Sequence, residues 1–185
     1  MSNTQKPGIN AVALKETIAA VTDNRALGQL TISVSSVSTG GTTGKTSTGT
    51  TVQAGETDNS RAGKFTVHSD EPVALLGTDA ALSPAEYISH ALAGCYIVSL
   101  GAIAAQRGIE LEKIDLDLDL DLDLAGFLGV DDSVRNGIQE IRVGVKIDAP
   151  GVSDATLAEL VEVLEQTSVI RETLINPVKV VTTLA

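Results

Sequence analysis

The pattern of apolar residues in the first part of the chain predicts one helix followed by a strand. After Asn10, a good N-cap, apolar residues recur at near-helical spacing as far as Val21, and Gly28 offers a stop signal. The segment QLTISVSSV (29–37) then alternates apolar residues with Thr and Ser. This alternation predicts a half-buried strand whose outer face is rich in hydroxyl groups.

The next segment is poor in large apolar residues. Residues 39–60 are mostly Gly, Thr and Ser, which predicts a mobile hairpin or loop with room for a short strand near Thr50–Gln53. The segment GKFTVHSD (63–70) returns to alternation and places Phe65 and Val67 on one face. It predicts a further strand.

A long helix is predicted to begin at SPAEYISHALAGCY (83–96). Ser83 as N-cap, Pro84 at the first helical position and Glu86 three residues after the cap form a capping box. The helix should run to Arg107 and end at Gly108. Because small and apolar residues occupy nearly every side of it, we expect a buried central helix.

Two strands with strict alternation follow. IDLDLDLDLDL (114–124) alternates Ile114 and leucines with five aspartates, and QEIRVGVKID (139–148) has the same period, with Arg142 and Lys146 on its outward face. Antiparallel pairing would set these cations against the aspartates. A flat row of carboxylates diverges, whereas Ca²⁺ needs converging oxygens, so we expect a solvated or salt-bridged face and no metal site.

The remaining segments complete the predicted layout. The connection AGFLGVDDSVRNG carries Phe127 and Leu128, which need a place to bury, and SDATLAELVEVLEQ has the spacing of an amphipathic helix. Asn176 and Pro177 should open a last short strand, Val178–Thr182. The order of elements predicts an α+β fold with a mainly antiparallel sheet around one core.

Composition and charge narrow the class of protein. The 185 residues are 43% hydrophobic and 20% charged, which suits a single globular domain. Thirteen Lys and Arg against 24 Asp and Glu give a net charge of −11, so we expect no nucleic-acid partner and no membrane partner. We expect no membrane span, because no run approaches the roughly 18 apolar residues that one needs, and the first residues lack the layout of a signal peptide. A cytoplasmic protein is expected.

Cys95 is the only cysteine, so it cannot form an intrachain disulfide. Any redox chemistry must use an outside thiol or a second copy of the chain. By helix phase, Cys95 shares its face with small and apolar residues such as Ile88, Ala91, Leu92 and Val98. A thiol buried in this way keeps a raised pKa and is inert, unless a cation from elsewhere reverses the effect. The residues alone therefore favour a structural cysteine.

Other catalytic arrangements are poorly supported. Glu86 lies nine residues before Cys95, about 180° away around the helix, and its capping role already explains it. His90 lies five residues before Cys95, about 140° around the helix, and His68 is the only other histidine. These positions disfavour a cysteine–histidine–carboxylate hydrolase. No zinc-ligand set, Walker sequence or GxGxxG motif occurs, so no cofactor is predicted.

An ordered set of motifs carries a family resemblance. SPAEYISHALAGC, RGIEL, LAGFLGVDD and SVIRETLINPVKV follow KFTVHSDEP in the chain. Together they resemble the OsmC/Ohr family of thiol-dependent hydroperoxide reductases over most of the chain after residue 62. GINAVALKETIAAV is similar to an N-terminal extension of one OsmC-like branch. We therefore predict a helical extension at residues 1–28 and an OsmC-like domain at residues 29–185.

The resemblance implies an intertwined homodimer in which antiparallel sheets wrap long central helices, with reactive sites at the subunit interface. In the peroxidase members a first cysteine, matched here by Cys95, attacks the peroxide as a thiolate and becomes a sulfenic acid. A second cysteine then closes a disulfide, which external dithiols reduce. An arginine stabilises the thiolate, and a carboxylate holds the arginine.

The chain departs from this pattern at three positions. Ser168 stands where the resemblance puts the second, resolving cysteine, so the intramolecular disulfide is lost. Ala85 stands where the peroxidase members carry the carboxylate. The region that should supply the arginine offers Lys45, with Arg61 further on, and a lysine lacks the planar fork of a guanidinium.

Two hypotheses of different classes remain. In the first, Cys95 is the thiol of a one-cysteine, peroxiredoxin-like hydroperoxide reductase of the oxidative-stress response. An external thiol or dithiol would reduce its sulfenic acid, and Arg61 or Lys45 of a partner subunit would lower its pKa. In the second, the dimer is an OsmC-like binding or stress protein that keeps the fold and a small pocket for an apolar ligand but has no peroxidase turnover.

Overall fold

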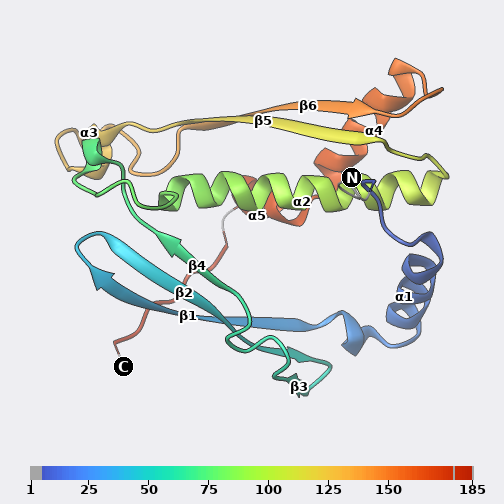
Figure 1. Cartoon of the computed structure of the whole chain (residues 1–185), viewed down its shortest axis with the longest axis horizontal. Coiled ribbons are helices and arrows are strands. Elements are labelled where there is room, and N and C mark those ends of the chain that lie inside the picture. Colours follow the sequence, from blue (N-terminus) through green and yellow to red (C-terminus); the bar gives the residue numbers. More distant parts are fainter. Residues whose placement is uncertain (1–5, 177, 185) are drawn as a thin grey trace, which may run out of the picture. The chain divides into compact units, whose positions relative to one another are not determined.

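The computed structural model describes residues 6–176 and 178–184. These residues form two compact units, one with the described residues up to Ala11 and those from Ile88 onward, the other running from Val12 to Tyr87. Helices and antiparallel strands are both present, so the predicted α+β class is confirmed. The elements labelled in Figure 1 are, in chain order, α1 (Ala11–Asp23), the short 3-10 helix η1 (Arg25–Gly28), β1 (Leu30–Gly40), β2 (Thr43–Gln53), β3 (Glu56–Asp58), β4 (Thr66–Ser69), the 3-10 helix η2 (Val73–Leu75), α2 (Pro84–Arg107), β5 (Lys113–Asp121), α3 (Leu124–Phe127), β6 (Glu140–Asp148), α4 (Asp154–Thr167) and α5 (Val169–Ile175).

The segment predicted as a mobile hairpin or loop is mostly strand, and the short strand expected near Thr50–Gln53 is the end of a longer one. Thr43–Gln53 forms β2, the strand of this sheet to which β1, β3 and β4 all pair in antiparallel fashion. The hairpin is confirmed, but the loop alternative was wrong because it took low hydrophobicity as a sign of mobility, whereas β-branched threonine favours extended backbone without any apolar partner. Hydroxyl groups also pair across the strands: the Oγ atom of Ser36 lies 2.7 Å from Oγ1 of Thr46.

The apolar side chains of this sheet are exposed. Val34 pairs with Thr48 and Val67 with Thr46, so Val34 and Val67 point to the same side of the sheet. The exposed fractions of these apolar side chains range from 47% to 68%, although the alternation predicted a half-buried strand. The apolar sheet face, as we call this set, consists of Leu30, Ile32, Val34, Phe65 and Val67.

Asp70 organises the loop between β4 and α2. Its carboxylate is fully buried and accepts hydrogen bonds from the hydroxyl groups of Thr42 (2.5 Å) and Thr78 (2.6 Å) and from the N–H groups of Glu71, Thr78 and Ala80. These bonds, those from the two hydroxyl groups above all, hold the pKa of Asp70 well below its usual range. One carboxylate thus ties the β1–β2 turn to the loop after β4.

Helix α2 begins and ends as predicted. The N–H and hydroxyl of Ser83 donate to a carboxylate oxygen of Glu86 at 2.7 and 2.8 Å, and the N–H of Glu86 returns a bond to the Ser83 hydroxyl at 3.3 Å. This is the reciprocal bonding of a capping box. At the other end, Gly108 has a φ of +69°, a left-handed conformation that glycine adopts without strain.

Strands β5 and β6 form a two-stranded antiparallel sheet that runs along α2 (Figure 1). Lys146 lies 2.8 Å from a carboxylate oxygen of Asp117, and the guanidinium of Arg142 binds both oxygens of Asp121. The prediction of a salt-bridged aspartate face is therefore confirmed. Exposed ion pairs contribute little to stability, and the apolar residues on the other face of the sheet pack against the core.

The buried apolar core lies within the unit that begins at Ile88. Leu160 and Leu164 of α4 are fully buried against α2, and the apolar faces of β5 and β6 cover the same cluster. The buried helix predicted for α2 is confirmed for one face only, because Ile97 and Val98 stay exposed. The α2 residues buried in the core are Leu92, Tyr96, Leu100, Ile103 and Ala104.

Two further predictions differ from the structure. Phe127 and Leu128 find no burial in this chain, and 71% of Phe127 is exposed. Residues 178–182 form no strand, because within the described residues no neighbouring strand pairs with them. Pro177, which was expected to open that strand, lies outside the described residues.

Helix α2 also bears on the membrane prediction. Contrary to the expectation from the sequence, it is long and apolar enough to cross a bilayer by length and composition, and no other helix of the described residues is. Core helices of soluble proteins pass the same test. Because α2 contributes Leu92, Leu100 and Ile103 to the packed cluster, we interpret it as a core helix.

The bonding of Asp70 generates a prediction about acid stability. The pKa of Asp70 in the folded protein lies below the unfolded value of about 4. Its contribution to the free energy of unfolding is therefore complete above about pH 4 and is lost as the pH falls further. Asp70→Asn should lower the melting temperature at pH 7, with a smaller effect at pH 3, as measured by circular dichroism. Asp79→Asn, which neutralises an exposed carboxylate of the same loop, is the control. Equal melting temperatures of the two variants at pH 7 would contradict the role of Asp70.

Candidate active site around Cys95

Cys95 is half-buried on α2 and lies next to hydroxyl groups. Its Sγ atom is 3.2 Å from Oγ of Ser168 and 4.0 Å from Oγ of Ser99, one helical turn further along α2. Helix phase could not reveal Ser168, which is 73 residues away in the chain. The thiol therefore has a polar neighbour that the α2 sequence does not contain.

Ser168 is held in place by the junction of two helices. It ends α4, where its N–H donates to the carbonyl of Leu164, and it is the N-cap of α5, where its hydroxyl oxygen accepts the N–H of Arg171 at 3.3 Å. Only 1% of Ser168 is exposed. A thiolate carries no hydrogen, so the Ser168 hydroxyl can only donate to it, while its oxygen keeps accepting from Arg171.

This environment reverses the expected effect on the thiol. Burial raises the pKa of Cys95, but the hydroxyl of Ser168, the N–H of Ile170, the hydroxyl of Ser99 and the N–H of Val169 together lower it by more. The net pKa lies below its ordinary value. The expectation of a raised pKa is therefore wrong, because hydrogen-bond donors of the α4–α5 junction favour the thiolate without any cation.

Arg171 and Glu165, which the sequence analysis did not single out, lie close to Tyr96, the residue that follows Cys95 on α2. Arg171 donates to the backbone carbonyl of Glu165 at 2.9 Å, and its guanidinium is 4.0 Å from the Glu165 carboxylate. Burial raises the pKa of Tyr96, and the positive charge of Arg171 opposes part of this rise. Arg171 and Glu165 each lie three positions from Ser168 in the sequence, and this spacing was the signal that could have revealed them.

The cations proposed from the resemblance lie in the other unit. Lys45 is on β2, opposite Val37 on one side and His68 on the other. The guanidinium of Arg61 lies 5.1 Å from the centre of the Phe65 ring. Both belong to the unit Val12–Tyr87, whereas Cys95 and Ser168 belong to the unit that begins at Ile88. Their action on Cys95 stays a prediction.

The remaining candidates have structural roles or stay untested. Glu86 is engaged in the capping box, whose Ser83 N–H and hydroxyl lower its pKa. The backbone carbonyl of His68 accepts the hydroxyl of Tyr87 at 2.5 Å. Within residues 6–176 and 178–184, no group of three or more His, Cys, Asp or Glu residues could hold a metal ion.

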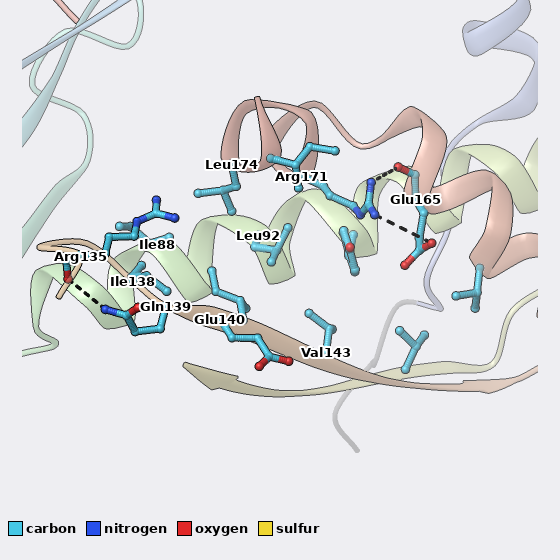
Figure 2. Close-up of a pocket in the computed structure, with 15 residues that line it drawn as sticks. Ile88, Leu92, Arg135, Ile138, Gln139, Glu140, Val143, Glu165, Arg171 and Leu174 are labelled. Carbon is cyan, nitrogen blue, oxygen red and sulfur yellow. Dashed lines mark hydrogen bonds and ion pairs between the residues drawn. The ribbon is translucent and has the colours of Figure 1, made fainter. Parts of the chain in front are cut away.

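A cavity of about 550 Å³ lies in the same unit as Cys95. Figure 2 shows its lining, with Arg135 at one end, Arg171 and Glu165 toward the other, and Leu92 between them. Most of the lining is apolar and comes from α2, β6, α4 and α5. Two of the lining residues connect the cavity to the site: Tyr96 follows Cys95 on α2, and the N–H of Arg171 on α5 donates to the Ser168 hydroxyl.

Comparison with known proteins assigns the family. A model of the OsmC family, described as OsmC-like protein, matches residues 77–183, which is more than half of the chain. No curated protein matches the chain.

Solved structures agree in fold. An OsmC-like protein from Mycoplasma pneumoniae has a TM-score of 0.61 and 15% identity, covering 80% of this chain and 89% of its own. The organic hydroperoxide resistance protein OsmC of Legionella pneumophila has a TM-score of 0.55 and 16% identity, covering 78% and 88%. The organic hydroperoxide resistance protein OhrB of Bacillus subtilis has a TM-score of 0.50 and 17% identity, covering 77% and 88%. At these identities the likeness concerns the fold, and together with the family match it means that the chain belongs to the OsmC family.

Proposed function

We propose that Cys95 is the reacting thiol of a one-cysteine peroxidase that reduces organic hydroperoxides in the oxidative-stress response. The observation that carries the proposal is the 3.2 Å contact between Sγ of Cys95 and the hydroxyl of Ser168. This hydroxyl and the N–H groups that follow it favour the thiolate, which is the nucleophilic form of cysteine. Two structural relatives are named organic hydroperoxide resistance proteins, which suits this chemistry.

The reaction begins with attack of the thiolate on one oxygen of the peroxide. An S–O bond forms while the O–O bond breaks, so Cys95 is oxidised to a sulfenic acid and the peroxide is reduced to an alkoxide, which takes up a proton and leaves as an alcohol. The role of Ser168 is to stabilise the thiolate before the attack and to hold Sγ in one position.

The sulfenic acid must be reduced from outside the chain. A serine hydroxyl cannot form a disulfide, and the chain has no second cysteine. An external thiol attacks the sulfenic sulfur, forms a mixed disulfide with Cys95 and releases water. A second thiol, or the other thiol of a dithiol, then displaces Cys95 and carries the disulfide away. At the position where the peroxidase members carry the resolving cysteine, this chain has Ser168, whose hydroxyl contacts Cys95.

We further propose that the active form is a cytoplasmic homodimer. The apolar sheet face, the Ile97–Val98 side of α2 and Phe127 are all exposed in the single chain. Exposed apolar side chains gathered on one face of an element are typical of an interaction site. A second copy that covers it would complete the half-buried pattern predicted for β1, and Arg61 or Lys45 of the partner subunit would be the cation near Cys95.

The second candidate function is binding of a small apolar molecule without turnover. The cavity of about 550 Å³ favours it, because its volume falls within the range of ligand pockets and its lining is mostly apolar. The two candidates differ in whether Cys95 reacts with a hydroperoxide.

The peroxidase proposal predicts saturable oxidation of Cys95. After a brief, limiting dose of an organic hydroperoxide, a sulfenic-acid trap should label Cys95, as read by mass spectrometry of the intact protein, and Cys95→Ser should stay unlabelled. Absence of an adduct at doses that oxidise free cysteine would contradict the proposal.

Removing the hydroxyl of Ser168 should slow the same reaction. Ser168→Ala raises the thiol pKa, so the rate of trapping against pH should rise at a higher pH than in the wild type. At pH 7 the loss should be roughly tenfold, the effect of about 1.4 kcal/mol, since a hydrogen bond to a charged group contributes about 1.5–3 kcal/mol and the site is not fully buried. Thr167→Ala, at an exposed neighbouring position, is the control. Identical pH profiles of Ser168→Ala and wild type would refute the role of Ser168.

Restoring a cysteine at position 168 should restore the intramolecular disulfide. The 3.2 Å contact between the side chains allows Ser168→Cys to bond to Cys95 on oxidation, with loss of both free thiols. Because this bond closes a loop of 73 residues, it should stabilise the oxidised protein by up to about 4 kcal/mol in urea unfolding, reversed by a dithiol. Thr167→Cys should keep two free thiols. Retention of both thiols in oxidised Ser168→Cys would contradict the geometry.

The dimer proposal predicts that a charge on the apolar sheet face dissociates the protein. Val34→Lys should raise the dimer dissociation constant by roughly tenfold or more, because the cation would be buried without a partner. Ser35→Lys, on the opposite face of β1, should have little effect. Sedimentation velocity over a concentration series measures both, and an unchanged Val34→Lys dimer would mean that this face is not the interface.

A further inference from the structure

The charges that line the cavity are not all balanced. The guanidinium of Arg171 lies 4.0 Å from a carboxylate oxygen of Glu165, and a carboxylate oxygen of Glu140 lies 3.5 Å from the guanidinium of Arg142. The guanidinium of Arg135 forms no hydrogen bond or ion pair with any residue of 6–176 or 178–184. The cavity thus carries one unpaired positive charge, in a chain whose net charge is −11.

The side chain of Arg135 is exposed, but its backbone is packed against α3. Gly126 of α3 lies so close to it that an added Cβ would be 2.7 Å from the carbonyl oxygen of Arg135 and 2.8 Å from that of Val134. The side-chain amide of Gln139 also donates to the Arg135 carbonyl at 2.9 Å, a bond drawn in Figure 2. The backbone that holds the guanidinium is therefore fixed on both sides.

Most of the other residues that line the cavity are apolar. Leu92 and Leu174 lie between Arg135 and the Arg171–Glu165 pair in Figure 2, and Val143 of β6 lines the same cavity. A ligand that fills this space must bury an apolar body, and a group that reaches Arg135 gains most if it is an anion whose two oxygens match the guanidinium fork.

We propose that this cavity binds an apolar carboxylate, with its carboxylate on Arg135 and its hydrocarbon body against Leu92, Val143 and Leu174. The inference names the ligand class for the binding activity that is the second candidate above, and it does not depend on any reaction at Cys95. The ligand is an amphiphile rather than a neutral hydrocarbon because of the unpaired guanidinium.

Calorimetric titration of the full chain with decanoate and with decanol tests the proposal. Decanoate should bind more tightly than decanol, and Arg135→Gln should weaken decanoate binding by roughly tenfold while leaving decanol unchanged. Arg25→Gln, which removes a charge from η1, should change neither affinity. Leu174→Trp, at a partly exposed position of the lining, should weaken both by filling the cavity.

Cys95→Ser separates this inference from the peroxidase proposal, because it should bind decanoate like the wild type. Equal decanoate affinities of wild type and Arg135→Gln would overturn the role of Arg135. No binding of either probe to the wild type, as when a second copy covers the cavity, would overturn the site and with it the binding activity, whatever the outcome of sulfenic-acid trapping.

Discussion

The packing of α4 against α2 is the contact on which the candidate site depends. Leu160 and Leu164 are fully buried against the face of α2 that contains Tyr96 and Leu100, and β5 and β6 cover the same cluster. This packing holds the C-terminal end of α4 in place against α2, and Ser168 is the C-cap at that end. The hydroxyl beside Cys95 is therefore positioned by a hydrophobic core rather than by a flexible loop, and loss of such packing costs several kcal/mol.

The site uses side-chain hydrogen bonds at helix starts. Ser83 and Ser168 are both N-caps, and in each case the serine has a second partner: the carboxylate of Glu86 for Ser83, and the sulfur of Cys95 for Ser168. A cap satisfies a backbone N–H that would otherwise lack a partner, so these serines support the fold before any chemistry begins. Because Ser168 serves α5 as well as Cys95, a serine at the resolving position has a structural reason to be there.

Apolar burial is distributed unevenly over the chain. The unit that begins at Ile88 contains the buried apolar clusters, whereas the described residues of the unit Val12–Tyr87 include just two buried side chains, Asp70 and Ser83. The sheet of that unit is held by strand pairing, hydroxyl pairs and the Asp70 carboxylate, and its apolar face remains exposed. Such a sheet is stable only when its apolar face is covered, which is the physical basis of the dimer proposal.

Local patterns in the sequence determined most of the secondary structure. The capping box of α2, the alternation of β5 and β6 and the amphipathic α4 were all predictable, because each depends on residues that are neighbours in the chain. Only the end of β2, near Thr50–Gln53, was predicted, because Thr-rich sequence fits both loop and strand, and pairing with β1 and β4 decided between them. The last strand was predicted and is absent, because a strand also needs a neighbouring edge.

Cys95 was identifiable as the one thiol, but its environment was not. Its helix neighbours predicted an apolar wall and a raised pKa, whereas the contact with Ser168 spans 73 residues and exists only once α4 has packed on α2. Arg171 and Glu165 reach Tyr96 for the same reason. The sequence by itself determined which residues could react and most of the helices and strands. Only the tertiary structure decided which groups surround the thiol, because the hydrogen bonds that lower its pKa join segments that are distant in the chain.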